Sequence, residues 1–381
     1  MRRDPLHQVS AGGSGAGDRR PPVAGGGTAW LGVAARVAAL LVGATLALLP
    51  FRARPTLAGA APPVRAAYFY SYMDTSHVDS LAAHGISRAI VKFNADSLDA
   101  RGRAEFARLG RRAAVLGMEL APDWLFQSPP RLAARPGGRR YTWGRNVVES
   151  EAPCPLDSAY WQSALIDRAE EFLSAAPSLK RVAVDLELYH GGRPHYDAGP
   201  CRCAFCLKEY AAGTPGLEGR DPSRLSGLLG YEEARVAGIL RPMLEAFARR
   251  HPGVRLEVLD LDLDSFVHRA LGRALARTGI PTTDYTERSY TAGAATLPAA
   301  RQRLRAIGLG SAPLVGGLWL KRFTPTALVP AMRAVEAGAD GWFIFTTYSL
   351  WLDPQKLTGP YTLLGSPSDY WSALARASAA P

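Results

Sequence analysis

Eight short apolar or aromatic runs recur along the chain, separated by stretches with the apolar spacing of amphipathic helices. Strand and helix alternating eight times is typical of a parallel α/β barrel. An open, doubly wound sheet is the alternative, but no glycine-rich dinucleotide fingerprint follows the first run. We therefore expect a (β/α)8 TIM barrel over residues 65–375. The predicted strands are residues 66–73, 88–94, 117–124, 181–189, 254–263, 281–287, 313–321 and 341–349.

The residues before the barrel differ from it in composition. Residues 1–28 contain Gly, Arg, Pro and Ser with almost no large apolar side chain, which favours a disordered tail. Residues 29–50 are apolar except for Arg36, and about twenty such residues cross a bilayer as a helix. We expect a transmembrane helix or signal-anchor here, followed by a linker at 51–64. Cleavage near Ala60 would instead release a secreted protein, and in both cases the barrel is expected outside the cytoplasm.

The net charge of +11 does not indicate a nucleic-acid partner. Residues 1–66 contain 8 Arg and 2 Asp, a net charge of +6, so the rest of the chain carries only +5. The arginines are spread among Ala, Gly and Pro rather than clustered with aromatic residues. We therefore expect no binding of nucleic acid.

Acidic residues alternate with apolar residues in the fourth run, where Asp185 and Glu187 share one parity. Successive residues of a strand face opposite sides of the sheet, so both acids are expected to point into the barrel mouth. Active sites of such barrels lie at the carboxyl ends of the strands. The fifth run repeats the alternation, with Asp260 and Asp262 opposite the leucines. Pairing of these acids with Arg is the structural alternative.

Aromatic, basic and amide side chains at the other strand ends suit a sugar, because aromatic rings stack on apolar sugar faces and polar groups bind hydroxyls. Hydrolysis of a glycosidic bond requires one carboxylic acid and a second carboxylate. Glu187 is the expected acid/base residue and Glu287 its favoured partner, with Asp185 or Asp260 as alternatives. No cofactor is expected for this catalysis. The predicted substrate-binding residues are Tyr68, Tyr70, Lys92, Asn94, Asp123, Trp124, Asp260, Asp262, Tyr285, Trp319, Lys321 and Tyr348.

The four cysteines fall in two predicted loops over the same face. They are Cys154, Cys201, Cys203 and Cys206, the last three forming a Cys-x-Cys-x-x-Cys motif. Four thiolates can hold a structural zinc ion, with His190 or His195 as a substitute ligand. In an exported protein they can instead form two disulfides. A cysteine nucleophile and an iron–sulfur radical enzyme are less favoured, the latter because its cysteines are more widely spaced and follow the first strand.

The stretches VDLELYH and CRCAFCLKEY, with CPLDSAYW upstream and GADGWFIFTTYSLW near the end, resemble a loose group of uncharacterised glycoside-hydrolase-like barrel proteins. In that group a fourth-strand acidic motif precedes a Cys-x-Cys-x-x-Cys loop. The resemblance implies a carbohydrate-active hydrolase over residues 65–375, with Asp185 and Glu187 as the acidic motif. The seventh run departs from the commonest retaining pattern because it has no carboxylate. Asp185 and Glu187 with Tyr285 are also faintly similar to chitinases, where the substrate's acetamido group replaces the nucleophile.

The sequence therefore predicts a membrane-associated barrel that hydrolyses a polysaccharide or glycan. One alternative is a non-catalytic carbohydrate-binding or cell-envelope scaffold. Another is an enzyme that depends on a divalent metal held by Asp185, Glu187, Asp260 and Asp262.

Overall fold

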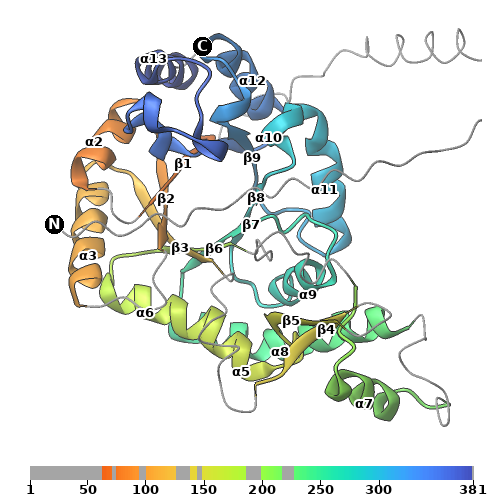
Figure 1. Ribbon diagram of the computed structural model, residues 1–381. Coiled ribbons are helices and arrows are strands. Elements are labelled where there is room, and N and C mark those ends of the chain that lie inside the picture. The colour runs from red at the N-terminus through yellow and green to blue at the C-terminus, as the bar shows by residue number, and fades with distance from the viewer. Residues whose placement is uncertain are drawn as a thin grey trace, which may run out of the picture. The chain divides into compact units, whose positions relative to one another are not determined.

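A computed structural model describes residues 62–70, 74–93, 100–125, 138–143, 148–185, 199–216 and 227–379 (Figure 1). For residues 124, 125, 143 and 148–152 it describes the backbone alone. The predicted tail, membrane segment and most of the predicted linker lie outside these ranges.

Eight parallel strands close into a barrel, which confirms the predicted fold class (Figure 1). Neighbouring strands follow one another in chain order, and pairing of the last strand with the first closes the ring. Each strand overlaps one of the eight predicted runs, and seven of the eight end before their run does, the exception being the third strand, which ends one residue after its run. The barrel strands are β1 (Val64–Tyr70), β2 (Arg88–Phe93), β3 (Glu119–Leu125), β6 (Arg181–Asp185), β7 (Arg255–Leu259), β8 (Thr282–Thr286), β9 (Leu314–Trp319) and β10 (Gly341–Phe345).

Helices surround the strands, as Figure 1 shows. None of the helices within the described ranges combines the length and apolar character needed to cross a bilayer. The α-helices are α2 (Thr75–Ala83), α3 (Ala100–Val115), α5 (Ser158–Trp161), α6 (Arg168–Ala175), α7 (Ala204–Gly213), α8 (Leu228–Arg250), α9 (Phe266–Leu275), α10 (Ser289–Ala292), α11 (Leu297–Ala306), α12 (Pro325–Gly338) and α13 (Pro367–Ser378). A π-helical stretch, η1 (Gln162–Asp167), joins α5 to α6. Short 3-10 turns are η4 (Gly293–Thr296), η5 (Leu320–Arg322), η6 (Thr347–Leu350), η7 (Pro354–Lys356) and η8 (Gly359–Tyr361).

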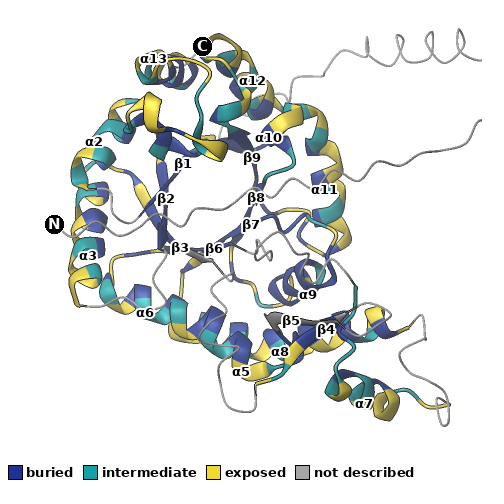
Figure 2. Cartoon of the chain, in the orientation of Figure 1, coloured by how far each residue is buried: buried dark blue, intermediate teal, exposed yellow. Residues whose placement is uncertain are grey.

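The strands are buried on both faces (Figure 2). On β6, Val182 and Val184 belong to the large apolar core between the strands and the helices. Ala183, of the opposite parity, belongs to a smaller cluster formed by inward-facing residues of the other strands. Asp185 shares the parity of Ala183, so it lies on the inner side at the carboxyl end of its strand.

An antiparallel hairpin, β4 (Arg140–Trp143) and β5 (Val148–Pro153), lies between β3 and β6 in the chain. Its residues are not among the predicted runs. Cys154 follows β5 directly, so the hairpin positions the first of the four cysteines.

A network of charged side chains, buried except for the half-exposed Glu119, lies inside the barrel at the opposite end, where the strands begin. Arg88 contacts Glu119 at 2.5 Å and Glu257 at 3.0 Å, and Arg181 pairs with the same two carboxylates. The hydroxyl of Tyr285 lies 2.7 Å from Nη1 of Arg88 and accepts its hydrogen bond. The Tyr285 side chain therefore points toward the start of the strands and not into the mouth, where we expected it to bind substrate.

The fifth run departs from the predicted alternation just past the end of β7. The strand stops at Leu259, and Asp260 takes a left-handed backbone conformation with φ of 60°. Leu259 consequently lies in the inner cluster and Leu261 in the outer core, although the sequence pattern placed them on one face. The period of two fails here because the chain has already turned out of the sheet.

Candidate functional site

Three side chains from three strands meet inside the carboxyl end of the barrel. The Tyr68 hydroxyl donates a hydrogen bond to Oδ2 of Asp123 and lies 3.5 Å from Oδ2 of Asp185. All three are nearly fully buried. Burial, reinforced by the charge of Asp123, raises the pKa of Tyr68 well above its ordinary value. The phenol therefore stays protonated and remains a hydrogen-bond donor to Asp123, with the Asp185 carboxylate close by.

Asp260 and Glu287 form a second acidic contact at the mouth. The backbone N–H of Glu287 donates to Oδ1 of Asp260 at 2.8 Å. Asp260 is 1% exposed, and its burial raises its pKa well above the ordinary range, with Glu287, Asp262 and Asp185 adding negative charge nearby. Burial therefore favours the neutral form of Asp260, and the negative charge of nearby acids, including Asp185 at the end of β6, acts in the same direction.

Asp262 is buried beside Asp260 in the chain but is paired with a cation. Its Oδ2 accepts from Nε of Arg288 at 2.6 Å. Burial raises the pKa of Asp262, although Thr286 and Arg288 oppose the shift. Asp284, from β8, is also buried and accepts from the N–H of Leu261 at 2.9 Å. Pairing with Arg, the structural alternative considered for the fifth run, thus holds for Asp262.

Aromatic rings from three neighbouring strands form a continuous wall on the other side of the mouth. Phe345 of β10 lies 5.7 Å from the Tyr68 ring and 6.1 Å from the Trp319 ring, between ring centres. It also stacks on Tyr290 of α10 at 5.4 Å. Nε1 of Trp319 donates to the carbonyl of Pro360 at 2.9 Å, which fixes the indole at the end of β9. Trp319 and Phe345 are only partly buried.

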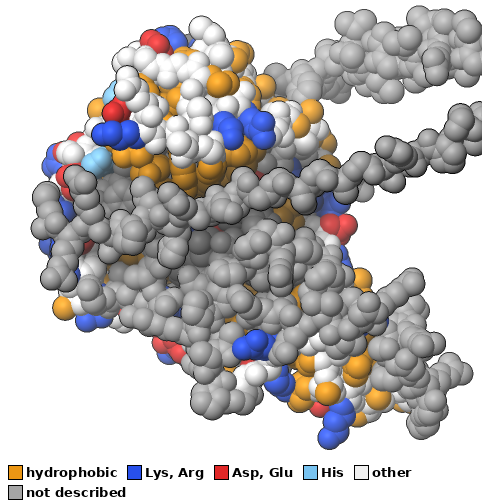
Figure 3. Space-filling view, viewed as in Figure 1, with side chains coloured by type: hydrophobic (Ala, Val, Ile, Leu, Met, Phe, Trp, Pro, Cys, Tyr) orange, Lys and Arg blue, Asp and Glu red, His pale blue; other side chains and the backbone are white. Residues whose placement is uncertain are grey.

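Three tyrosines extend this wall. The rings of Tyr70 and Tyr348 lie 5.1 Å apart, and those of Tyr348 and Tyr361 lie 5.0 Å apart. The Tyr70 and Tyr361 hydroxyls are within hydrogen-bonding distance at 2.9 Å. Figure 3 shows hydrophobic side chains with Lys and Arg beside them where the segment after β10 lies. Of this aromatic set, Tyr290, Phe345 and Tyr361 are not among the substrate-binding residues predicted from the sequence.

Two basic side chains predicted to bind substrate contact aromatic rings. Nζ of Lys92 lies 5.8 Å from the centre of the Tyr68 ring, and Nζ of Lys321 lies 5.5 Å from that of Trp319. Asn94 and Glu187 lie outside the described residues, and Trp124 is described by its backbone alone. The structure therefore brings together most of the predicted residues that it describes, with Tyr285 and Asp262 engaged elsewhere.

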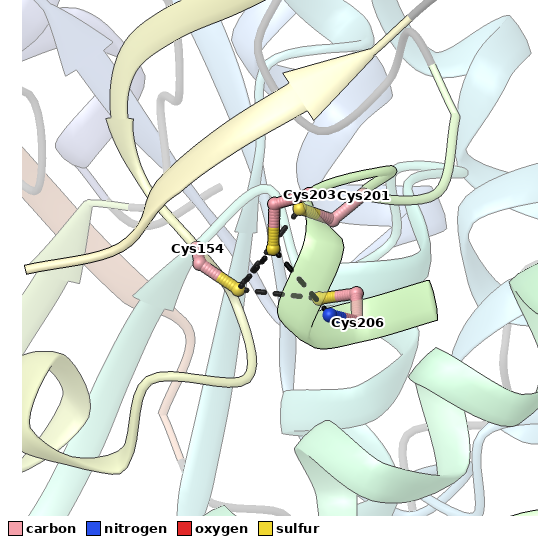
Figure 4. A group of neighbouring side chains, drawn as sticks. All are labelled: Cys154, Cys201, Cys203 and Cys206. Carbon is pink, nitrogen blue, oxygen red and sulfur yellow. Dashed lines mark hydrogen bonds between the residues drawn. The ribbon is translucent and has the colours of Figure 1, made fainter. Parts of the chain in front are cut away.

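The four cysteine sulfurs converge on one point, as Figure 4 shows. All Sγ atoms lie within 4.8 Å of one another. The Sγ of Cys154 lies 3.3 Å from that of Cys206, 3.9 Å from that of Cys201 and 3.8 Å from that of Cys203. All four are free thiols, three of them buried. This group of four cysteines can bind a metal ion.

Secondary structure and neighbouring side chains position the thiols. Cys203 is the N-cap residue of α7, and its Sγ accepts from the N–H of Cys206 at 3.5 Å. The motif is therefore built into the start of a helix rather than lying wholly in a loop. The carboxylate of Glu232, from α8, accepts from the N–H of Cys201 at 2.7 Å. Burial raises the pKa of Glu232 to about 9.

Among the described residues, no other set of three or more His, Cys, Asp or Glu side chains is arranged to hold a metal ion. Glu187, one of the four acids of the alternative divalent-metal site, lies outside the described residues, so that alternative stays a prediction. His190 and His195, considered as substitute ligands for the cysteines, lie outside the described residues.

No family model and no curated protein sequence matches this chain. Solved structures do match it. A β-galactosidase from Marinomonas ef1 has a TM-score of 0.55 at 10% identity, over 83% of this chain and 59% of its own. An O-GlcNAc hydrolase from Thermobaculum terrenum has a TM-score of 0.44 at 11% identity, over 83% of this chain and 63% of its own. A deoxyribose phosphate aldolase from Aeropyrum pernix has a TM-score of 0.35 at 14% identity, over 73% and 84%.

The chain thus spans about three fifths of the length of the first two structures, and its neighbours include glycoside hydrolases with a TIM-barrel fold. The likeness to the β-galactosidase supports that fold. Because barrels of this kind host many unrelated activities, chemistry has to be argued from the mouth itself.

Proposed function

We propose that the barrel mouth binds a carbohydrate and hydrolyses a glycosidic bond with carboxylate side chains. The observation that carries this proposal is the division of the mouth into two sides. Acids from β3, β6 and the turn after β7 lie on one side, and the wall of Tyr68, Phe345 and Trp319 lies on the other. A sugar stacked on the wall would present its polar edge to the acids.

Glu187 is the proposed general acid and Glu287 its partner. Asp185 ends β6 on the inner side, and Glu187 follows two residues later in the sequence. Asp185, held beside the Tyr68 hydroxyl, would orient the reacting groups. Asp260, whose neutral form is favoured by burial, is the alternative acid, because the N–H of Glu287 donates to its Oδ1 and holds it beside Glu287. A protonated and an ionised carboxyl are the two forms that glycoside hydrolysis requires.

A screen for released reducing ends tests this proposal. The purified full chain would be incubated with a panel of polysaccharides and oligosaccharides, with binding to each measured in parallel. Hydrolysis of at least one glycan supports the enzyme. Binding without any hydrolysis would overturn the proposed activity.

Binding without hydrolysis would favour a non-catalytic carbohydrate-binding scaffold. One observation supports this second candidate. Strand β9 ends in Gly316, Gly317, Leu318 and Trp319, with no carboxylate where many retaining barrel enzymes carry one. A scaffold would keep the aromatic wall and have no need of a second catalytic acid.

For the cysteines we propose a structural zinc ion. Tetrahedral zinc with Zn–S bonds of about 2.3 Å separates its sulfurs by about 3.8 Å. The distances of 3.3, 3.8 and 3.9 Å from the Cys154 sulfur fit such a cage. They exceed the length of about 2.05 Å that a disulfide requires. The ion would connect the segment after hairpin β4–β5 to the start of α7. In the chain, the hairpin precedes and α7 follows β6, the strand that carries Asp185.

We also propose that residues 29–50 attach the barrel to a membrane on its extracytoplasmic side. Its support is the apolar stretch from Trp30 to Leu49, broken only by Arg36. Fractionation of cells that express the full chain tests it. The protein should stay with membranes after alkaline carbonate extraction, whereas release into the soluble fraction would contradict an anchor.

A further inference from the structure

Lys92 is a nearly buried cation inside the barrel mouth. It is 9% exposed, and its Nζ lies 5.8 Å from the centre of the Tyr68 ring and 6.0 Å from that of Tyr70. Asp123 is its register partner on β3, but the Asp123 carboxylate accepts from Tyr68 instead. Among the described residues, Lys92 forms no ion pair with a carboxylate.

The opposite end of the barrel shows how this chain otherwise treats buried cations. Arg88 and Arg181 each contact both Glu119 and Glu257. A buried charge without an opposite charge is costly, so such pairing is the rule. Lys92 departs from that rule because, among the described residues, no carboxylate pairs with it, and it lies at the end of the barrel where we propose that a ligand binds.

Two further cations lie at the other end of the aromatic wall. Nζ of Lys321 lies 5.5 Å, and Cζ of Arg322 lies 5.0 Å, from the centre of the Trp319 ring. Within the described part of the chain, neither is paired with an acid. Rings of Tyr68, Phe345 and Trp319 connect these cations to Lys92.

We infer that the mouth selects a glycan that carries negative charges, as carboxylates of uronic acids or as sulfate esters. This inference rests on the proposed function and names its substrate class. Sugar rings would stack along Phe345 and Trp319, with one anionic group reaching Lys92 and another reaching Lys321 or Arg322. Charge-assisted hydrogen bonds to an ammonium or guanidinium are stronger than neutral ones. Asp123 and Asp185 would repel the anionic groups, and so turn the uncharged glycosidic oxygen toward the acids.

Binding of charged and neutral oligosaccharides to the full chain tests this inference. Calorimetry would compare an oligogalacturonate with a neutral galactan oligosaccharide of equal length, and dextran sulfate with dextran. We expect the acidic member of at least one pair to bind at least about tenfold more tightly, with affinity that falls as salt rises. The pair that shows the preference identifies the anionic group as carboxylate or sulfate.

Variants locate the preference in the mouth. Lys92→Met should reduce it by about tenfold, and Lys92→Arg should retain most of it. Lys180→Met is the matched control, because Lys180 is exposed and precedes β6 at the other end of the barrel. Should Lys92→Met fail to fold, Lys321→Met at the partly buried rim serves the same purpose.

Two results would overturn the inference in different ways. Equal binding of acidic and neutral oligosaccharides, or an undiminished preference in folded Lys92→Met and Lys321→Met, would remove the charge selection and leave the proposed function standing. Absence of binding to every carbohydrate tested would remove both.

Discussion

The hydroxyl of Tyr68 lies 3.5 Å from Oδ2 of Asp185. Side chains from the first and fourth strands of the barrel thus approach each other inside its mouth. The same hydroxyl donates to Asp123 of the third strand. One protonated phenol thus holds two acids whose strands are neighbours. This contact sets the geometry of the acidic side of the mouth, and removing it should change catalysis without unfolding the barrel.

Tyr68→Phe should therefore lower kcat more than it raises KM. Loss of a hydrogen bond to a charged group is worth about 1.5–3 kcal/mol, which corresponds to roughly a 10- to 100-fold lower rate. Steady-state kinetics on the glycan identified by screening would measure this. Tyr231→Phe is the control, because the Tyr231 hydroxyl donates to the carbonyl of Glu209 on α7. Equal kcat for Tyr68→Phe and the unaltered chain would rule out a positioning role for this hydroxyl.

The cysteine cluster should bind one zinc ion per chain. Metal analysis of purified protein is expected to find this ratio, and Cys206→Ser should lower both zinc content and melting temperature because it removes one of four ligands. Thiol counting on the denatured protein after chelation should give four free thiols. Zero thiols with no bound metal would show two disulfides and refute the zinc site.

Asp284 should make the folded protein less stable as pH rises. Its burial raises its pKa well above the value of about 3.9 in an unfolded chain. The folded state thus keeps a proton that the unfolded state releases, so the free energy of unfolding falls from about pH 4 upward, until the folded-state pKa is passed. Asp284→Asn removes this titration and keeps an oxygen for the N–H of Leu261.

Urea denaturation at pH 5 and pH 7 measures the effect. We expect the loss of stability between the two pH values to be smaller in Asp284→Asn than in the unaltered chain. Asp264→Asn should leave that difference unchanged, because Arg303 holds the pKa of Asp264 below its ordinary value and keeps it ionised at both pH values. Parallel pH profiles for Asp284→Asn and the unaltered chain would contradict the assignment.

Arg88→Met should destabilise the barrel by about 1.5–3 kcal/mol, since the fully buried Glu257 loses one charged hydrogen bond while Arg181 still pairs with it. Equilibrium unfolding in urea would measure this loss. Arg101→Met, which breaks an exposed pair with Glu105 on α3, should have no measurable effect. Similar stability of the two variants would mean that the charge network at the strand starts adds little.

Local patterns predicted the strands because each barrel strand is a short run of β-forming residues whose two parities meet different surroundings. Asp185 could be placed for that reason. Asp260 could not be placed, because it takes a left-handed backbone conformation directly after Leu259 and so ends the alternation of the strand. Glycine usually marks such a position in a sequence, and none is present here. Pairing of Asp262 with an arginine was foreseen only as an alternative, and the sequence pattern did not identify Arg288 as the partner.

Contacts between residues far apart in the chain could not be predicted from local sequence patterns. The partner of Tyr285 is Arg88, 197 residues away, and a tyrosine at a strand end carries no mark that it will point to the other end of the barrel. Tyr361 enters the aromatic wall from a segment after the last strand, where no periodicity applies. The four cysteines, by contrast, were predictable as a group, because their spacing suits a metal site.

Glycan hydrolysis by the full chain and by its Glu187→Gln and Asp185→Asn variants tests the central claim most directly. The claim predicts released reducing ends from at least one glycan. It also predicts a rate that falls by about 100- to 10,000-fold in Glu187→Gln, with binding of that glycan largely unchanged. A Glu187→Gln variant with the full rate, or an unaltered chain that releases no reducing ends from any glycan, would contradict it.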